Sequence, residues 1–153
     1  MANTYTQIHI HAVFAVQNRQ SLVLPAWKDQ LFKYITGIVT HNGHKLLVIN
    51  GMPDHVHLLF GLRPHQSLSE LMRDVKRNSS LWINEKKWVR GKFSWQEGFS
   101  AFSYSQSQLK DVIHYIENQE LHHQKKSFSE EYREMLRLFD IPFDERYILK
   151  EPV

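Results

Sequence analysis

Two histidines one residue apart, His55 and His57, have a spacing that suits a shared metal ion. In a β-strand, residues i and i+2 point to the same face, with Cα atoms roughly 6.6 Å apart at ~3.3 Å per residue. Two imidazoles leave a metal site incomplete, so a third ligand has to come from elsewhere in the chain. His9 and His11 repeat the arrangement in a chain with ten histidines. The spacing alone therefore leaves open which pair binds metal, and whether either pair is only a polar sheet face.

Tyr115 is a candidate nucleophile, because a tyrosine can attack phosphorus. Tyr115, Gln119 and His122 fall at positions i, i+4 and i+7, along one flank of the apolar side of a predicted helix. The free pKa of a tyrosine is about 10, so the phenol needs help at neutral pH. A metal ion that polarises the phosphate supplies that help. The alternative interpretation is a half-buried tyrosine beside a surface glutamine.

The elements that must position these residues follow from the apolar pattern of the chain. Alternating or continuous apolar residues predict extended segments over 5–16, 45–50, 55–62 and 93–104. Apolar residues at helical spacing predict helices over about 25–42, 67–86, 106–124 and 128–139. The order β-α-β-β-α-β is that of the split βαβ or ferredoxin-like fold. We therefore predict an α+β fold, a ferredoxin-like sandwich in which an antiparallel sheet has helices on one face, with additional C-terminal helices that carry the tyrosine.

The composition is that of a globular protein, with 42% hydrophobic and 23% charged residues. The length of 153 residues predicts a single domain over 1–153, with a core at about 4–125 and a C-terminal helix and tail at about 126–153. The lack of cysteine excludes a disulfide framework, a thiolate zinc site and a cysteine nucleophile. It also suits the reducing cytoplasm, where we expect the protein. No apolar run reaches the ~18–20 residues of a membrane span, and we expect no signal peptide.

Basic residues concentrate between residues 63 and 92, where eight lysines and arginines are opposed by three acids, although the net charge of the chain is only +3. Such a local excess favours a polyanionic partner such as nucleic acid, and a solvated helix face is the alternative. As candidate DNA contacts we name Arg73, Lys76, Arg77, Lys86, Lys87 and Arg90. Contacts of this kind with phosphates give affinity and salt dependence rather than sequence choice.

Two segments together resemble a known family. Pro53-Asp54-His55-Val56-His57-Leu58-Leu59, followed later by Tyr115-Ile116-Glu117-Asn118-Gln119, is similar to the motifs of the HUH single-tyrosine transposases, the IS200-like transposases of small insertion sequences. The resemblance spans roughly residues 4–125. It implies that His55 and His57 bind Mg²⁺ or Mn²⁺ and that Gln119 completes the metal site. It also implies that Tyr115 attacks a DNA phosphodiester, forming a 5′-phosphotyrosine link and releasing a 3′-OH.

The resemblance also implies the partners. Members of this family act on single-stranded DNA with hairpin ends, form homodimers in which the tyrosine helix can complete the partner's site, and rejoin strands without a nucleotide cofactor. The predicted function is thus metal-dependent DNA transposition. It stays open whether His122 or His123 replaces or assists Gln119, and which subunit Tyr115 serves. Two other functions remain as alternatives, a non-catalytic nucleic-acid-binding module and a metal-dependent phosphodiesterase that uses water.

Overall fold

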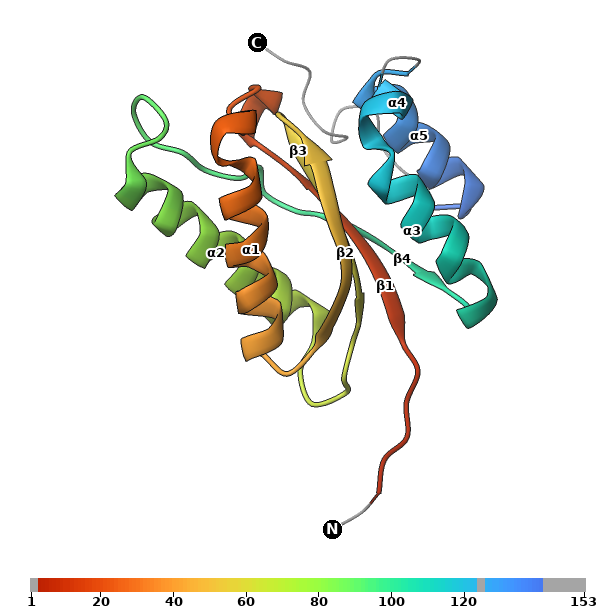
Figure 1. Ribbon diagram of the computed structural model, residues 1–153. Helices are drawn as coiled ribbons and strands as arrows, with labels where there is room; N and C mark the ends of the chain where they lie inside the picture. Colours follow the sequence, from red (N-terminus) through yellow and green to blue (C-terminus); the bar gives the residue numbers. More distant parts are fainter. Residues whose placement is uncertain (1–2, 124–125, 142–153) are drawn as a thin grey trace.

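Four antiparallel strands form one sheet with the order β2-β3-β1-β4. This computed structural model describes residues 3–123 and 126–141 (Figure 1). The strands are β1 (His9–Ala15), β2 (Lys45–Met52), β3 (His55–Gly61) and β4 (Ser100–Tyr104). Together with the two helices that connect them, they confirm the predicted β-α-β-β-α-β order and the ferredoxin-like α+β fold.

One face of the sheet is covered by α1 (Pro25–His41) and α2 (Leu68–Lys86). Pro25 stands at the first helical position of α1, where its missing N–H costs nothing. Ser67 caps α2 by accepting a hydrogen bond from the backbone N–H of Glu70. The central strands send alternate apolar side chains into this core, namely Ile10, Ala12, Phe14, Val56, Leu58 and Phe60.

The other face is covered by the C-terminal helices α3 (Leu109–Glu117), α4 (Gln119–His123) and α5 (Phe128–Leu138) (Figure 1). Leu59 of β3 packs against α3, while Val13 and Ala15 of β1 pack against α5. The remaining central side chains on this face are three buried histidines, His11, His55 and His57. A sheet face that would otherwise be solvated is therefore closed over a polar centre.

The continuous helix predicted over 106–124 is wrong. A short 3-10 turn over Gln106–Gln108 precedes α3, and Asn118 (φ −103°, ψ 32°) separates α3 from α4. The side chain of Asn118 donates to the carbonyl oxygen of His114 at 2.7 Å, a local bond that competes with helix continuation. From β2, Asn50 donates to the carbonyls of Ile116 and Glu117 and so satisfies the last turn of α3.

Two predicted strands are shorter than expected. β1 begins at His9, and in the extended segment 93–104 the strand itself covers only Ser100–Tyr104, with a single bridge from Trp95 to Val16. The turn between β2 and β3 consists of Pro53 and Asp54, because Gly51 and Met52 still belong to β2. Among the residues that the structure describes, no helix combines the length and the apolar character needed to cross a membrane.

Candidate active site

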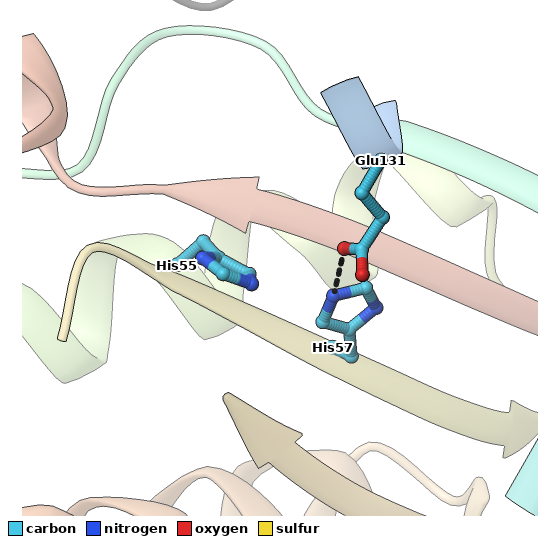
Figure 2. A group of neighbouring side chains, drawn as sticks. All are labelled: His55, His57 and Glu131. Carbon is cyan, nitrogen blue, oxygen red and sulfur yellow. Dashed lines mark ion pairs between the residues drawn. The ribbon is translucent and has the colours of Figure 1, made fainter. Parts of the chain in front are cut away.

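His55 and His57 lie on β3, on the face that the C-terminal helices cover, and both are fully buried. Val56 between them points into the core on the opposite face. Figure 2 shows the two imidazoles along β3 and Glu131 reaching toward His57 from α5. Strand alternation thus brings the two rings onto one enclosed surface, next to a carboxylate from the far end of the chain.

The Nδ1 atom of each imidazole is occupied by a protein partner. His55 Nδ1 donates to Asp54 Oδ1 at 2.7 Å, and Asp54 Oδ2 accepts from both Nε and Nη2 of Arg19, at 3.1 and 3.0 Å. His57 Nδ1 lies 2.7 Å from Nε2 of His11, at hydrogen-bond distance. Partners of this kind orient metal-binding histidines in proteins and set the tautomer. Both Nε2 atoms are left to face the enclosed centre.

The protonation of His55 leaves a lone pair in that centre. Burial lowers the pKa of His55 to about 4, although the hydrogen bond to Asp54 favours the charged form. The neutral ring carries its proton on Nδ1, where it donates a hydrogen bond to Asp54, so Nε2 is an acceptor. Oε1 of Gln119 lies 3.2 Å from this Nε2. Two acceptors repel at such a distance, so either a cation between them or a rotated amide is required.

Gln119 reaches the histidines because the helix is interrupted at Asn118, between α3 and α4. It is the first residue of α4 and is fully buried, whereas Tyr115 is half-buried near the end of α3. The structure therefore brings together the four residues that the sequence singled out, His55, His57, Tyr115 and Gln119. They do not meet along one continuous helical flank, since a non-helical residue separates the tyrosine from the glutamine.

Tyr115 stands beside the histidine pair. Its ring centroid lies 6.0 Å from that of His57 and 6.5 Å from that of His11. Burial raises the pKa of Tyr115 above its ordinary value, and the carboxylate of Glu131, which is also its hydrogen-bond partner, raises it further. The phenol is thus protonated at neutral pH. Tyr115 and Glu131 both line a cleft of about 400 Å³ between α3 and α5, which gives a ligand access to them.

Glu131 is the residue that the sequence analysis missed. It is 5% exposed, its Oε1 lies 3.2 Å from Nε2 of His57, and its Oε2 lies 3.5 Å from Nε2 of His123. Burial alone would raise the pKa of Glu131, but contacts with His123 and His57 lower it far below the ordinary range. The available signal was an acid on the apolar side of a helix, between Phe128 and Met135.

The remaining histidines take different places. His123 packs against His55, with ring centroids 4.8 Å apart, and contacts Glu131. The side chain of His122 lies outside the described residues. His11 contacts His57, so the 9–11 pair contributes a partner to the centre. In the described part of the chain, the histidines and acids close enough to hold one ion are His55, His57 and Glu131, with ligand atoms within 4.8 Å of one another.

Comparison with known proteins identifies the family. The family model described as "Transposase IS200 like" matches residues 4–119, which include the histidine pair, Tyr115 and Gln119. The chain belongs to the IS200-like transposases. The ISDra2 transposase TnpA of Deinococcus radiodurans is 26% identical over 120 residues, covering 74% of this chain and 84% of that relative. The match to the family model ends before α5 begins.

Solved structures agree on the fold of this IS200-like transposase. A putative transposase from Deinococcus radiodurans superposes with a TM-score of 0.61 at 24% identity, covering 78% of this chain and 96% of the other. A REP-associated tyrosine transposase bound to a REP hairpin superposes with a TM-score of 0.57 at 16% identity, covering 76% of this chain and 68% of the other. At these identities the likeness extends to the fold alone.

The basic residues of this transposase lie across the sheet from Tyr115. Arg73 and Arg77 are exposed on α2, which covers the face opposite α3 and α5 (Figure 1). Lys86, Lys87 and Arg90 are exposed at the end of α2 and beyond it. Lys76 is half-buried, and its Nζ donates to the carbonyls of Gln96 and Gly98, at 2.7 and 2.8 Å. Burial also lowers the pKa of Lys76.

Lys76 and Arg77 are therefore expected to respond differently to substitution. Lys76→Met should destabilise the fold by about 1–3 kcal/mol, because two carbonyls lose their donor, and should leave the salt dependence of DNA binding unchanged. Arg77→Met should change stability by less than about 0.5 kcal/mol and reduce the salt slope by about 1. Urea unfolding, and titration of a labelled single-stranded oligonucleotide at several salt concentrations, measure the two effects. A reduced salt slope in Lys76→Met would contradict this assignment.

Proposed function

We propose that this transposase cleaves and rejoins single-stranded DNA at the ends of an insertion sequence through a 5′-phosphotyrosine intermediate on Tyr115, with the help of a divalent metal ion. The observation that carries the proposal is the placement of Tyr115 beside the buried His55–His57 pair, in a chain of the IS200-like transposase family. The likeness to a hairpin-bound transposase supports a hairpin-forming DNA partner for this chain as well.

The residues present fit a divalent cation. Each imidazole has its Nδ1 tied to a partner and its Nε2 facing inward, which is how proteins prepare histidine ligands. Nε2 of His57 is buried without a hydrogen-bond partner. In this proposal His55, His57 and Gln119 hold Mg²⁺ or Mn²⁺. When bound, the ion supplies positive charge that polarises the scissile phosphate and stabilises the charge that develops.

The chain's own residues then account for the reaction. The hydroxyl oxygen of Tyr115 attacks the phosphorus, and the bond from phosphorus to the 3′-oxygen of the preceding nucleotide breaks. The tyrosine proton passes to solvent, and the departing 3′-oxygen takes up a proton from solvent. That nucleotide leaves with a free 3′-OH. Attack on the phosphotyrosine by another 3′-OH reverses the step and joins the strands. One phosphoester bond is exchanged for another at each step, so no nucleotide cofactor is needed.

A covalent-trapping experiment tests the proposal. Purified protein is mixed with Mn²⁺ and labelled single strands from the DNA that flanks the gene, and the products are separated on a denaturing gel. We expect a shifted protein–DNA band that disappears when EDTA removes the metal. Cleavage without a shifted band would indicate a phosphodiesterase that uses water, and tight binding without any reaction would indicate a binding module.

Within the proposed homodimer, we expect Tyr115 to serve the histidine pair of its own chain, beside which it lies. Tyr115→Phe and His57→Ala subunits, mixed and allowed to exchange, should then give no more covalent product than either variant alone. Each subunit would still lack one part of its own site. Product that recovers on mixing would show that the tyrosine acts on the partner subunit. Light scattering on the same samples reports whether dimers are present.

A further inference from the structure

We propose that Glu131 is a fourth protein ligand of the cation, beside His55, His57 and Gln119, so that α5 contributes a carboxylate oxygen to the metal site. The inference rests on the proposed metal-dependent function and changes its ligand set. Glu131 lies beyond the stretch that the family model matches, residues 4–119. The carboxylate therefore lies in the C-terminal segment, outside that match.

The geometry is close to that of a formed site. Ligand atoms about 2.1 Å from one ion lie roughly 3–4 Å from each other. One nitrogen of each of His55 and His57 and one oxygen of Glu131 all lie within 4.8 Å of one another. Oε1 of Glu131 and Nε2 of His57 are already 3.2 Å apart. Distances of about 3–4 Å between all three atoms would place them around one ion.

Buried atoms without hydrogen bonds point into this space. Oε1 of Glu131 and Nε2 of His57 are both buried, and the 3.2 Å contact between them lacks hydrogen-bond geometry. A buried polar group without a partner is costly, and a buried charge more so, unless it is paired or coordinates a metal. A cation between the two atoms would satisfy both. The second oxygen of Glu131 faces His123, which orients the carboxylate.

The first turn of α5 holds Glu131 in place. Ser127 caps the helix by accepting a hydrogen bond from the backbone N–H of Glu130. The ring of Phe128 stacks on the ring of His55, with centroids 3.7 Å apart and planes 1° from parallel. Arg19 donates to Oγ of Ser129 at 3.0 Å. Phe128 and Ser129 thus join the start of α5 to His55 and Arg19, and Glu131 follows two residues after Ser129.

The additional ligand changes what the site binds. Imidazole nitrogens alone favour the later transition metals, whereas Mg²⁺ and Mn²⁺ prefer oxygen donors. A carboxylate adds both an oxygen and a negative charge, which strengthens the binding of a divalent ion. With Glu131 in place, the centre suits an oxygen-preferring cation better than two histidines and an amide do.

Direct measurement of Mn²⁺ binding tests the proposal without DNA. Free Mn²⁺ is followed by its electron paramagnetic resonance signal during titration of the full-length chain. We expect Glu131→Gln to weaken binding at least about 10-fold, by analogy with the loss of groups that support a metal site. The matched control is Glu130→Gln, which removes the same charge from an exposed neighbour in the same helical turn. It should change affinity by less than about 2-fold.

The sign of the change separates the explanations. Tighter Mn²⁺ binding in Glu131→Gln would overturn the proposal, because it would make Glu131 a competitor for His57. Unchanged binding would overturn it as well. If circular dichroism shows that this variant does not fold, Glu131→Asp keeps the charge but withdraws the carboxylate by one methylene, and unchanged affinity there would equally overturn the proposal. Since the assay contains no DNA, its result is independent of whether the covalent product forms.

Discussion

Tyr115→Phe is expected to abolish the covalent protein–DNA product and to lower the rate of strand cleavage at least about 10⁴-fold, the scale of removing an enzyme's nucleophile. The substitution removes one oxygen and keeps the ring that packs near His57 and His11. Folding should therefore be retained. The hydrogen bond from the hydroxyl to Glu131 is lost, but the carboxylate itself stays, so Mn²⁺ affinity should change by less than about 3-fold. The covalent-trapping gel and the Mn²⁺ titration measure the two quantities on the same preparation.

The matched control is Tyr104→Phe. Tyr104 is a half-buried tyrosine on β4 that lines the same cleft, and its ring centroid lies 6.1 Å from that of His11. Removing its hydroxyl should leave cleavage within about 3-fold of the unmodified protein. Equal losses in the two variants would mean that the cleft needs phenol groups in general. Cleavage that survives Tyr115→Phe would favour a water nucleophile.

Asp54→Asn is expected to be the most destabilising single change at the site, by about 3–5 kcal/mol, because it leaves a buried guanidinium without its anion. The side chain of Arg19 is 5% exposed and that of Asp54 is 17% exposed. The variant also loses the carboxylate that accepts the hydrogen bond from His55 Nδ1, so Mn²⁺ affinity should fall about 10–100-fold. Urea unfolding and Mn²⁺ titration measure these effects.

Two comparisons sharpen this prediction. Asp29→Asn, at an exposed position on α1, should change stability by less than about 0.5 kcal/mol. The double variant Arg19→Met with Asp54→Asn removes both charges, so it should recover much of the stability but not the metal affinity. If the double variant is as unstable as Asp54→Asn alone, the buried charge is not the cause.

The effect of Asp54 also has a definite pH dependence. Burial would raise the pKa of Asp54, but the hydrogen bond and charge of His55, together with Arg19, lower it below its ordinary value. A carboxylate whose pKa is lower in the folded state stabilises the fold above its unfolded pKa, about 3.9. This contribution is lost as the pH falls through the folded value. The difference in stability between the unmodified protein and Asp54→Asn should therefore shrink below about pH 4.

The fold could be read from the sequence where local patterns decide the structure. Apolar spacing in the sequence predicted the order of the strands and helices and placed the bounds of α1, α2 and β3 within one residue of those in the structure. The break at Asn118 could not be read in the same way. At this break, Asn50 of β2 donates hydrogen bonds to the last carbonyl oxygens of α3. A contact between residues so distant in the chain produces no periodic pattern in the sequence.

The candidate active site could be predicted only in part, because some of its residues are brought together by contacts between distant parts of the chain. His55 and His57 are neighbours in the chain, so spacing reveals them. Glu131 follows a helix cap, where an acid is ordinarily explained by the helix dipole. Arg19 adopts a left-handed backbone conformation (φ 55°) that is uncommon for arginine, and only the folded structure shows it held by Asp54 and Ser129.

Phe128 at the start of α5 stacks on His55, which is one of the proposed metal ligands. The docking of α5 on the sheet and the proposed binding of metal at His55 and His57 would therefore be linked equilibria. A ligand that binds only the docked arrangement stabilises that arrangement by its own binding free energy, ~2.7 kcal/mol at a concentration 100 times its Kd. The backbone amides of α5 then open less often, and their hydrogens exchange more slowly with solvent. Hydrogen exchange in α5 would thus report the occupancy of the proposed metal site on β3, a strand that lies much earlier in the sequence.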